Sequence, residues 1–134
     1  MSGAATITLR KYLLLRAWNL PVDPWTVVSV ALTRQVPALN AGENQLDEPV
    51  GNGYGRIAVP WNSATWGLAN DTEVANKIAL NFGAASGYWG SITGWAIIAY
   101  GLPAAVGTLD TPLKVTSGIA PYVPIGGCSF GVFD

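Results

Sequence analysis

Charged side chains are too scarce in this chain to cover the surface of a domain that stays dissolved by itself. Its 134 residues include seven Lys or Arg and eight Asp or Glu, so that 11% are charged and 50% are hydrophobic. An ordinary soluble domain has about 25% charged residues, which keep it dispersed. A chain with so few must have its surface covered by lipid or by other protein. We therefore expect a subunit whose surface is largely used in contacts with other subunits.

Lipid is the weaker alternative, because no segment has the pattern of a membrane-spanning helix. The long uncharged stretch at residues 88–109 contains glycines, a proline and polar side chains, whereas a spanning helix needs about 20 mostly apolar residues. The first five residues also lack the basic region and apolar run of a signal peptide. We expect no membrane partner and synthesis in a cytoplasm.

Nucleic-acid binding and catalysis have little support in the sequence. The formal net charge is −1, and the basic cluster Arg10, Lys11 and Arg16 is too small to neutralise several phosphates. The chain has no histidine, which removes the commonest general base and metal ligand. Cys128 is the single cysteine, and a buried small hydrophobic residue is its simplest interpretation.

The acidic residues gather in two groups, Glu43 with Asp47 and Glu48, and Asp71 with Glu73. Carboxylates in turns are usually solvated or cap the local backbone. No Asp-rich loop with a closing Glu, which a calcium site would need, is present. We therefore expect no enzymatic activity, no cofactor and no metal site.

The length predicts one domain over residues 1–134. An N-terminal helix is expected over residues 5–20, where the run 7–18 is rich in Leu and free of Gly and Pro. Its apolar face is broad enough to contact two surfaces, which makes Tyr12, Leu15 and Trp18 candidates for contact with a partner protein. Packing on its own domain is the alternative for the same face.

After the expected helix, the apolar residues repeat every second position, which is typical of strands. Residues 66–71 read as a turn, and residues 37–53 as an exposed acidic loop that is either solvated or in contact with a partner. In the segment 75–82, Ile78, Leu80 and Phe82 are expected to point inward. Strands are expected at residues 26–32, 55–61, 75–82, 92–100, 113–116 and 128–133. The pattern predicts an all-β domain, a β-sandwich or jelly-roll-like barrel of about 6–8 short antiparallel strands with one N-terminal helix.

Six tryptophans are unusual in so short a chain. Trp61, Trp66 and Trp89 lie in or beside expected loops, where one small domain has difficulty hiding a large ring. Tryptophan is enriched at the centres of protein interfaces, and its flat face also stacks on sugars. Three roles stay open for these residues: the core, a subunit interface or a platform for a glycan.

Four segments follow one another in a recognisable order: VVSVAL, GNGYGRIAV, ANKIALNFGAASGYWGSITGWAIIAY and TPLKVTSGIAPYVPIGG. In this order the chain resembles, over about residues 12–133, the small tailed-phage virion proteins described as head decoration or tail-fibre-like. The best-matching segments are residues 53–56 and 89–95. The chain departs from the family pattern at residues 60–62 and 64–66, where two tryptophans replace plainer small residues.

The resemblance implies an all-β virion subunit without catalytic residues, commonly a trimer and made in the host cytoplasm. The leading expectation is a capsid decoration (cement) protein that binds the outer surface of the head shell and stabilises it. Its partners would be further copies of itself, as a homotrimer, and the major capsid protein or other virion proteins. The alternative is a head-fibre or tail-fibre component that contacts a host glycan. A lectin-like module unconnected with a virion agrees less well with the low charge.

Overall fold

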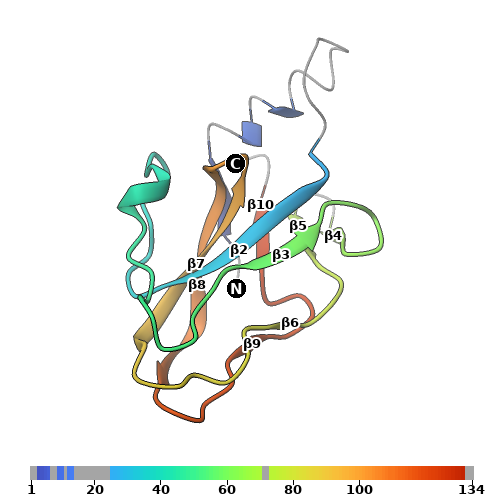
Figure 1. Ribbon diagram of the computed structural model, residues 1–134. Helices are drawn as coiled ribbons and strands as arrows, with labels where there is room; N and C mark the ends of the chain where they lie inside the picture. Colours follow the sequence, from blue (N-terminus) through green and yellow to red (C-terminus); the bar gives the residue numbers. More distant parts are fainter. Residues whose placement is uncertain (1–2, 7–8, 11, 14–24, 71–72, 132–134) are drawn as a thin grey trace.

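The protein is described by a computed structural model over residues 3–6, 9–10, 12–13, 25–70 and 73–131. In this part of the chain the strands form a curled eight-stranded sheet and a separate two-stranded sheet (Figure 1). The order of the large sheet is β3-β2-β7-β8-β1-β10-β5-β4, and β6 pairs with β9 in the small one. The bounds are β1 (Gly3–Ala5), β2 (Val27–Thr33), β3 (Ile57–Pro60), β4 (Trp66–Asn70), β5 (Glu73–Asn76), β6 (Leu80–Asn81), β7 (Gly90–Ala99), β8 (Leu102–Val115), β9 (Tyr122–Val123) and β10 (Ser129–Gly131).

The three central strands, β2, β7 and β8, place apolar residues on both faces of the large sheet. Val30 and Ile97 are paired and belong to the main core on the concave side. The neighbouring pair, Ala31 and Ala96, points to the opposite face, because successive side chains of a strand alternate. Strands that are covered on both sides lose the usual apolar–polar alternation, which explains the apolar run in β7. The nearly all-β half-barrel confirms the predicted fold class.

The structure has more strands than expected, and one pairing is parallel. Strands β1, β6, β9 and β10 contain only two or three residues each, too few to show alternation in a sequence. β1 pairs with β10 in parallel and with β8 in antiparallel orientation. The N-terminal strand therefore inserts between two strands from the C-terminal third of the chain (Figure 1).

Three local predictions were wrong. Residues 66–70 form strand β4 rather than a turn, because they pair along β5. The expected strand at residues 75–82 is broken into β5 and β6, and Ile78 is exposed rather than inward. Strand β8 begins at Leu102, far before the expected start, and continues through Pro103 and Pro112. Both prolines lie at shifts in the register with β7, where the missing N–H costs no ladder hydrogen bond.

Most of the helix expected over residues 5–20 lies outside the described residues. Ala5 belongs to strand β1, so a helix does not begin there. Helical backbone is present at Leu9, Arg10, Tyr12 and Leu13, and the Arg10 N–H donates to the Thr6 carbonyl. Leu9 and Tyr12 are buried in the main core. Within the described part of the chain, no helix is long and apolar enough to cross a membrane.

Candidate protein–protein contact site

A row of aromatic rings in contact with one another crosses the concave side of the sheet. Tyr12 stacks on Trp25 at 4.1 Å between ring centroids, and Trp25 meets the edge of Trp61 at 5.5 Å. Trp61 then contacts Trp66 at 5.5 Å, and Trp66 contacts Phe130 at 6.3 Å. Buried aromatic pairs contribute about 0.5–1.5 kcal/mol each beyond the area that they bury. The row thus joins the N-terminal segment to both ends of the large sheet.

The aromatic row lies where the two edges of the sheet come together. Strands β3 and β4 are the edge strands, and residues 61–65 connect them directly (Figure 1). The Trp66 indole N–H and the Thr65 hydroxyl both donate to the Pro60 carbonyl, so the connection is fixed at its start. A shallow groove of about 310 Å³, lined by Trp61, Trp66 and the exposed Leu68 among others, opens on the outside of this seam.

The structure buries three of the four predicted contact residues that it describes. Tyr12, Trp66 and Trp89 are buried, and Trp89 is only 2% exposed. The Trp89 indole N–H donates to the Asn52 carbonyl at 2.8 Å, so the core is the role that the structure assigns to this ring. Trp61 is partly buried and keeps one side at the groove. Leu15 and Trp18 lie outside the described residues.

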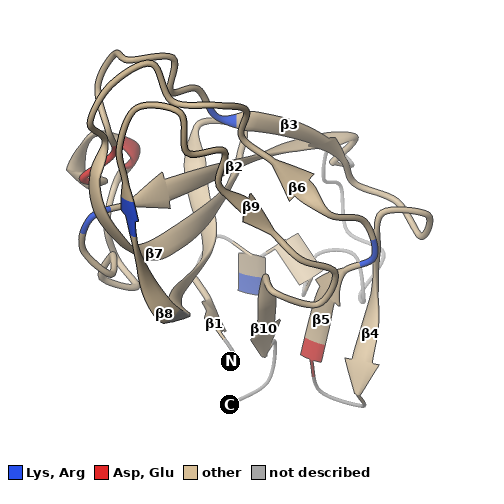
Figure 2. Ribbon diagram, turned by 90° about the horizontal axis from the view of Figure 1, so that it is seen from below, with Lys and Arg blue, Asp and Glu red and all other residues tan. Residues whose placement is uncertain are grey.

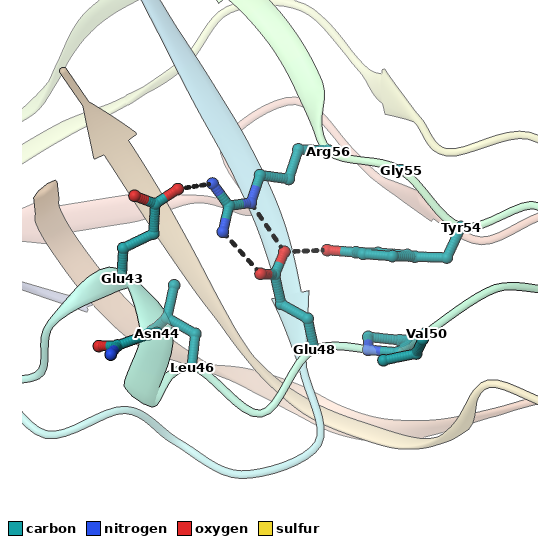
Figure 3. A pocket seen from close by; sticks show the side chains of 9 residues that line it. Glu43, Asn44, Leu46, Glu48, Val50, Tyr54, Gly55 and Arg56 are labelled. Carbon is teal, nitrogen blue, oxygen red and sulfur yellow. Dashed lines mark hydrogen bonds and ion pairs between the residues drawn. The ribbon is translucent and has the colours of Figure 1, made fainter. Parts of the chain in front are cut away.

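An ionic cluster ties the acidic loop to strand β3, as Figure 3 shows. The Arg56 guanidinium donates two hydrogen bonds to Glu48, at 2.9 and 2.7 Å, and one to Glu43 at 2.6 Å. The Tyr54 hydroxyl donates to the same Glu48 carboxylate at 2.7 Å and accepts from the Leu32 N–H at 3.1 Å. The best-matching motif of the resemblance, residues 53–56, therefore supplies both of the side chains that hold Glu48.

The cluster changes the acidity of its members. Burial alone would raise the pKa of Glu48, but the hydrogen bonds from Arg56 and Tyr54 and the charge of Arg56 lower it below its ordinary value. Burial, and then the hydrogen bond to Glu48, raise the pKa of Tyr54. The hydrogen bonds to Glu48 and Glu43 outweigh burial and raise the pKa of Arg56. Near neutral pH, Glu48 and Arg56 are therefore ionised and Tyr54 is neutral, and in these states the three side chains hold the loop.

The acidic loop covers the convex face of the sheet. Leu46 packs against the small apolar cluster that includes Ala31, Ala96 and Ile98. A second ion pair, from Arg34 to Asp47 at 2.7 Å, holds the same stretch, and the Arg34 N–H donates to the Asp47 carbonyl. The three acids predicted to be solvated or in contact with a partner thus all pair with arginines of the same chain. The broad opening beside the cluster, about 760 Å³ in volume, is shallow and lined by residues between 43 and 50 of the loop and by residues 54–56 that follow it.

The opposite situation is found at residues 78–90 and 116–127, which we call the uncharged end. Neither segment contains Lys, Arg, Asp or Glu. Figure 2 shows strands β6 and β9 without either charge colour. Five large hydrophobic residues of this end are exposed: Ile78, Tyr88, Ile119, Tyr122 and Ile125. The tryptophans give no signal for this site, whereas the two charge-free stretches can be read directly from the sequence.

The fold and its surface define a structural class of protein: an all-β domain with buried tryptophans, ion pairs that hold the acidic loop, and exposed apolar residues of which five lie on the uncharged end. Residues 12–130 match the family model described as Podophage GP4 fiber I protein gp80, and the chain belongs to this family. No curated protein matches the chain. The family is one of phage virion structural proteins, so the predicted resemblance to tailed-phage virion proteins is confirmed. The protein is part of the virion.

Proposed function

We propose that this chain is a fibre subunit of the phage particle. The observation that carries the proposal is the family match, which spans residues 12–130 and bears the name of a fibre protein. The apolar side chains exposed on the uncharged end support it, since monomeric proteins rarely leave large contiguous apolar patches uncovered. Its role is structural: it holds its place by contact with copies of itself, as a homotrimer, and with other virion proteins.

Capsid decoration, the leading expectation from the sequence, has less support than the fibre. The family name speaks of a fibre and not of the head shell. The rings expected to contact the shell, those of Tyr12 and Trp66, are buried within the chain. Burial of Trp89 likewise gives no support to a glycan platform at that ring. We propose no catalytic role, because the chain lacks histidine and Glu43, Asp47 and Glu48 are all ion-paired.

Copy number and position on purified particles test the proposal. Gel densitometry against the major capsid protein, together with immunogold labelling, should give few copies and label at fibres. A copy number close to that of the major capsid protein, with label over the whole shell, would show that the chain is a decoration protein and not a fibre subunit.

Particles that lack the protein give a second and independent test. A fibre subunit does not reinforce the shell, so heat should release the genome at the same temperature as from complete particles. A decoration protein binds only the assembled shell and stabilises it by mass action, so its loss would lower that temperature.

A further inference from the structure

The uncharged end is built from two segments that backbone hydrogen bonds join along their length. The Ala85 N–H donates to the Ile119 carbonyl and the Gly118 N–H donates to the Ala85 carbonyl, both at 2.8 Å. Further along, Phe82 donates to Pro121, and Leu80 and Asn81 pair with β9. The exposed side chains are therefore carried on a backbone that is already fixed, which lowers the entropy cost of binding.

The exposed apolar side chains follow one another along this pair of segments. Ile125 is 69% exposed and Tyr122 is 60% exposed. The Asn76 amide donates to the carbonyls of both Ile78 and Pro124, which brings Ile78 and Ile125 to the same end of the row. Lys77, the nearest charge along the chain, donates its ammonium to the Ser63 carbonyl in the connection between β3 and β4. The row therefore contains no ionised group of its own.

The absence of charge indicates what covers this surface. Removing an ionised group from water without a partner costs free energy, and an uncharged surface cannot supply that partner. The complementary surface must itself be nearly free of charge. Elsewhere the described chain carries Arg10, Glu73, Lys77, Lys114 and the ion pairs of Arg34 and Arg56, although residues 57–70 are free of charge as well. The uncharged end of a second copy meets the requirement, and the repetition of one surface around an axis is the usual way in which subunits assemble.

The uncharged end supplies much, but not all, of the surface that such a contact needs. A stable interface buries about 800 Å² on each partner and uses about 20–30 residues a side. The two segments contain 25 residues, of which seven are buried and 18 lie at the surface. An area of 800 Å² would be about a ninth of the 7186 Å² of accessible surface of the chain.

We propose that the uncharged end, residues 78–90 with 116–127, is the surface by which copies of this chain associate, packed against the same end of a neighbouring copy. The inference deepens the proposed function, because it names the surface by which a fibre subunit contacts its own copies. The tyrosines at 88 and 122 supply large rings with few rotatable bonds, which suits the centre of an interface.

Sedimentation of the purified full-length chain over a range of micromolar concentrations tests this surface. The wild type should associate. Ile125→Asp and Tyr122→Asp should each weaken association by about a hundredfold or more, because each buries an unpaired carboxylate. Leu102→Asp is the matched control: Leu102 is 51% exposed at the start of strand β8, outside the uncharged end and the groove beside Trp61, and its replacement should leave association unchanged.

A second variant keeps the test valid if an aspartate disturbs folding. Ile125→Cys is close in size and lies on the surface, so mild oxidation should give a covalent dimer. Leu102→Cys should give none under the same conditions, and the native Cys128 is buried. A monomeric wild type, equal association of the wild type and Ile125→Asp, or equal cross-linking of both cysteine variants would overturn the proposal. Each of these results concerns the purified chain, so it is separate from the position and copy number on particles that test the fibre itself.

Discussion

Two regions of this molecule are held in place by opposite kinds of interaction, one ionic and one neutral. The acidic loop, residues 37–53, is held on the sheet by ionised groups: Arg56 pairs with Glu48 and Glu43, and Arg34 pairs with Asp47. The uncharged end is held by neutral hydrogen bonds and by the buried amide of Asn76. In the acidic loop, the charged side chains thus pair with one another within the chain, whereas a monomer ordinarily exposes such charges to solvent. The uncharged end has none to present, and its apolar side chains are free for association.

Tyr54 links the two regions. Its ring lies 5.3 Å from that of Trp89 and 6.5 Å from that of Phe82, in the core beneath the uncharged end. Its hydroxyl donates to Glu48 in the ionic cluster. The low charge of the chain is therefore not evenly spread. Five of the fifteen charged residues fix the acidic loop, and the uncharged end has none.

The largest expected effect comes from Asn76→Ala. The Asn76 side chain is buried, and it donates to the Ile78 and Pro124 carbonyls and accepts from the Cys128 N–H at 2.9 Å. Each buried backbone group left without a partner costs about 1–3 kcal/mol, so we expect a loss of about 3 kcal/mol or more. Urea unfolding should show a lower midpoint with an unchanged slope.

Asn81→Ala is the control for that substitution, because Asn81 is exposed in the adjacent strand β6. Its effect should stay within about 0.5 kcal/mol. If Asn76→Ala were no more destabilising than Asn81→Ala, neutral hydrogen bonds would not be what holds the uncharged end together.

Arg56→Ala should have the next largest effect. It removes three hydrogen bonds and leaves Glu48, whose side chain is only 16% exposed, without its cation. We expect a loss of about 2 kcal/mol in the free energy of unfolding, since hydrogen bonds to charged groups contribute about 1.5–3 kcal/mol. Arg56→Lys keeps the charge but not the paired geometry of the guanidinium. Its free energy of unfolding should lie between those of the wild type and Arg56→Ala.

The same substitution separates the two regions. If the ionic cluster serves only the acidic loop, Arg56→Ala lowers the unfolding midpoint and leaves the association of the folded chain unchanged in sedimentation. Loss of association at a concentration where the variant is still folded would show that the two regions are coupled through Tyr54.

Lowering the pH should weaken the ionic cluster that holds the acidic loop and not the contacts of the uncharged end. Folding lowers the pKa of Glu48 below its ordinary 4.5, so the native state holds this proton less tightly than the unfolded state. The stability that Glu48 contributes is therefore complete above pH 4.5 and is lost as the pH falls through the folded value. Glu48→Gln keeps an acceptor for Tyr54 but cannot titrate, so its stability should fall less between pH 5 and pH 3 than that of the wild type. Parallel curves for the two proteins would contradict this assignment.

Much of the fold could be predicted because its signals are local. The alternation in β2 and the unbroken apolar run in β7 identify two central strands from a few neighbouring residues each. Strand β4 was missed because its Gly67 and Asn70 are typical of turns, and only the pairing with β5 makes the segment extended. The start of β8 was missed because Pro103 ordinarily ends a strand. Here it lies where the register with β7 shifts.

The candidate site could be predicted less well, because burial depends on contacts between distant residues. The tryptophans were expected to be hard to hide in one domain, yet the curl of the sheet brings Trp25, Trp61 and Trp66 into one row. Trp95 is covered in the same way: its ring lies against the bare backbone of Gly3 and Gly107, where an added Cβ would come within 2.6 and 2.3 Å. The expectation of a surface largely used in contacts with other subunits rested on the charge count alone and stays a prediction.

The smallest effect should come from Arg34→Ala. The Arg34–Asp47 pair is solvated, with side chains 43% and 39% exposed, and such pairs contribute about 0.2–1 kcal/mol. A double-mutant cycle with Asp47→Ala measures the coupling directly. In about 1 M salt the screening length falls to about 3 Å, so the coupling should largely disappear. The Arg56–Glu48 pair is less exposed and should keep most of its coupling under the same conditions. Equal loss of both couplings in salt would mean that solvent reaches the two ion pairs alike, and the loop would then be held by the packing of Leu46 on the convex face rather than by its charges.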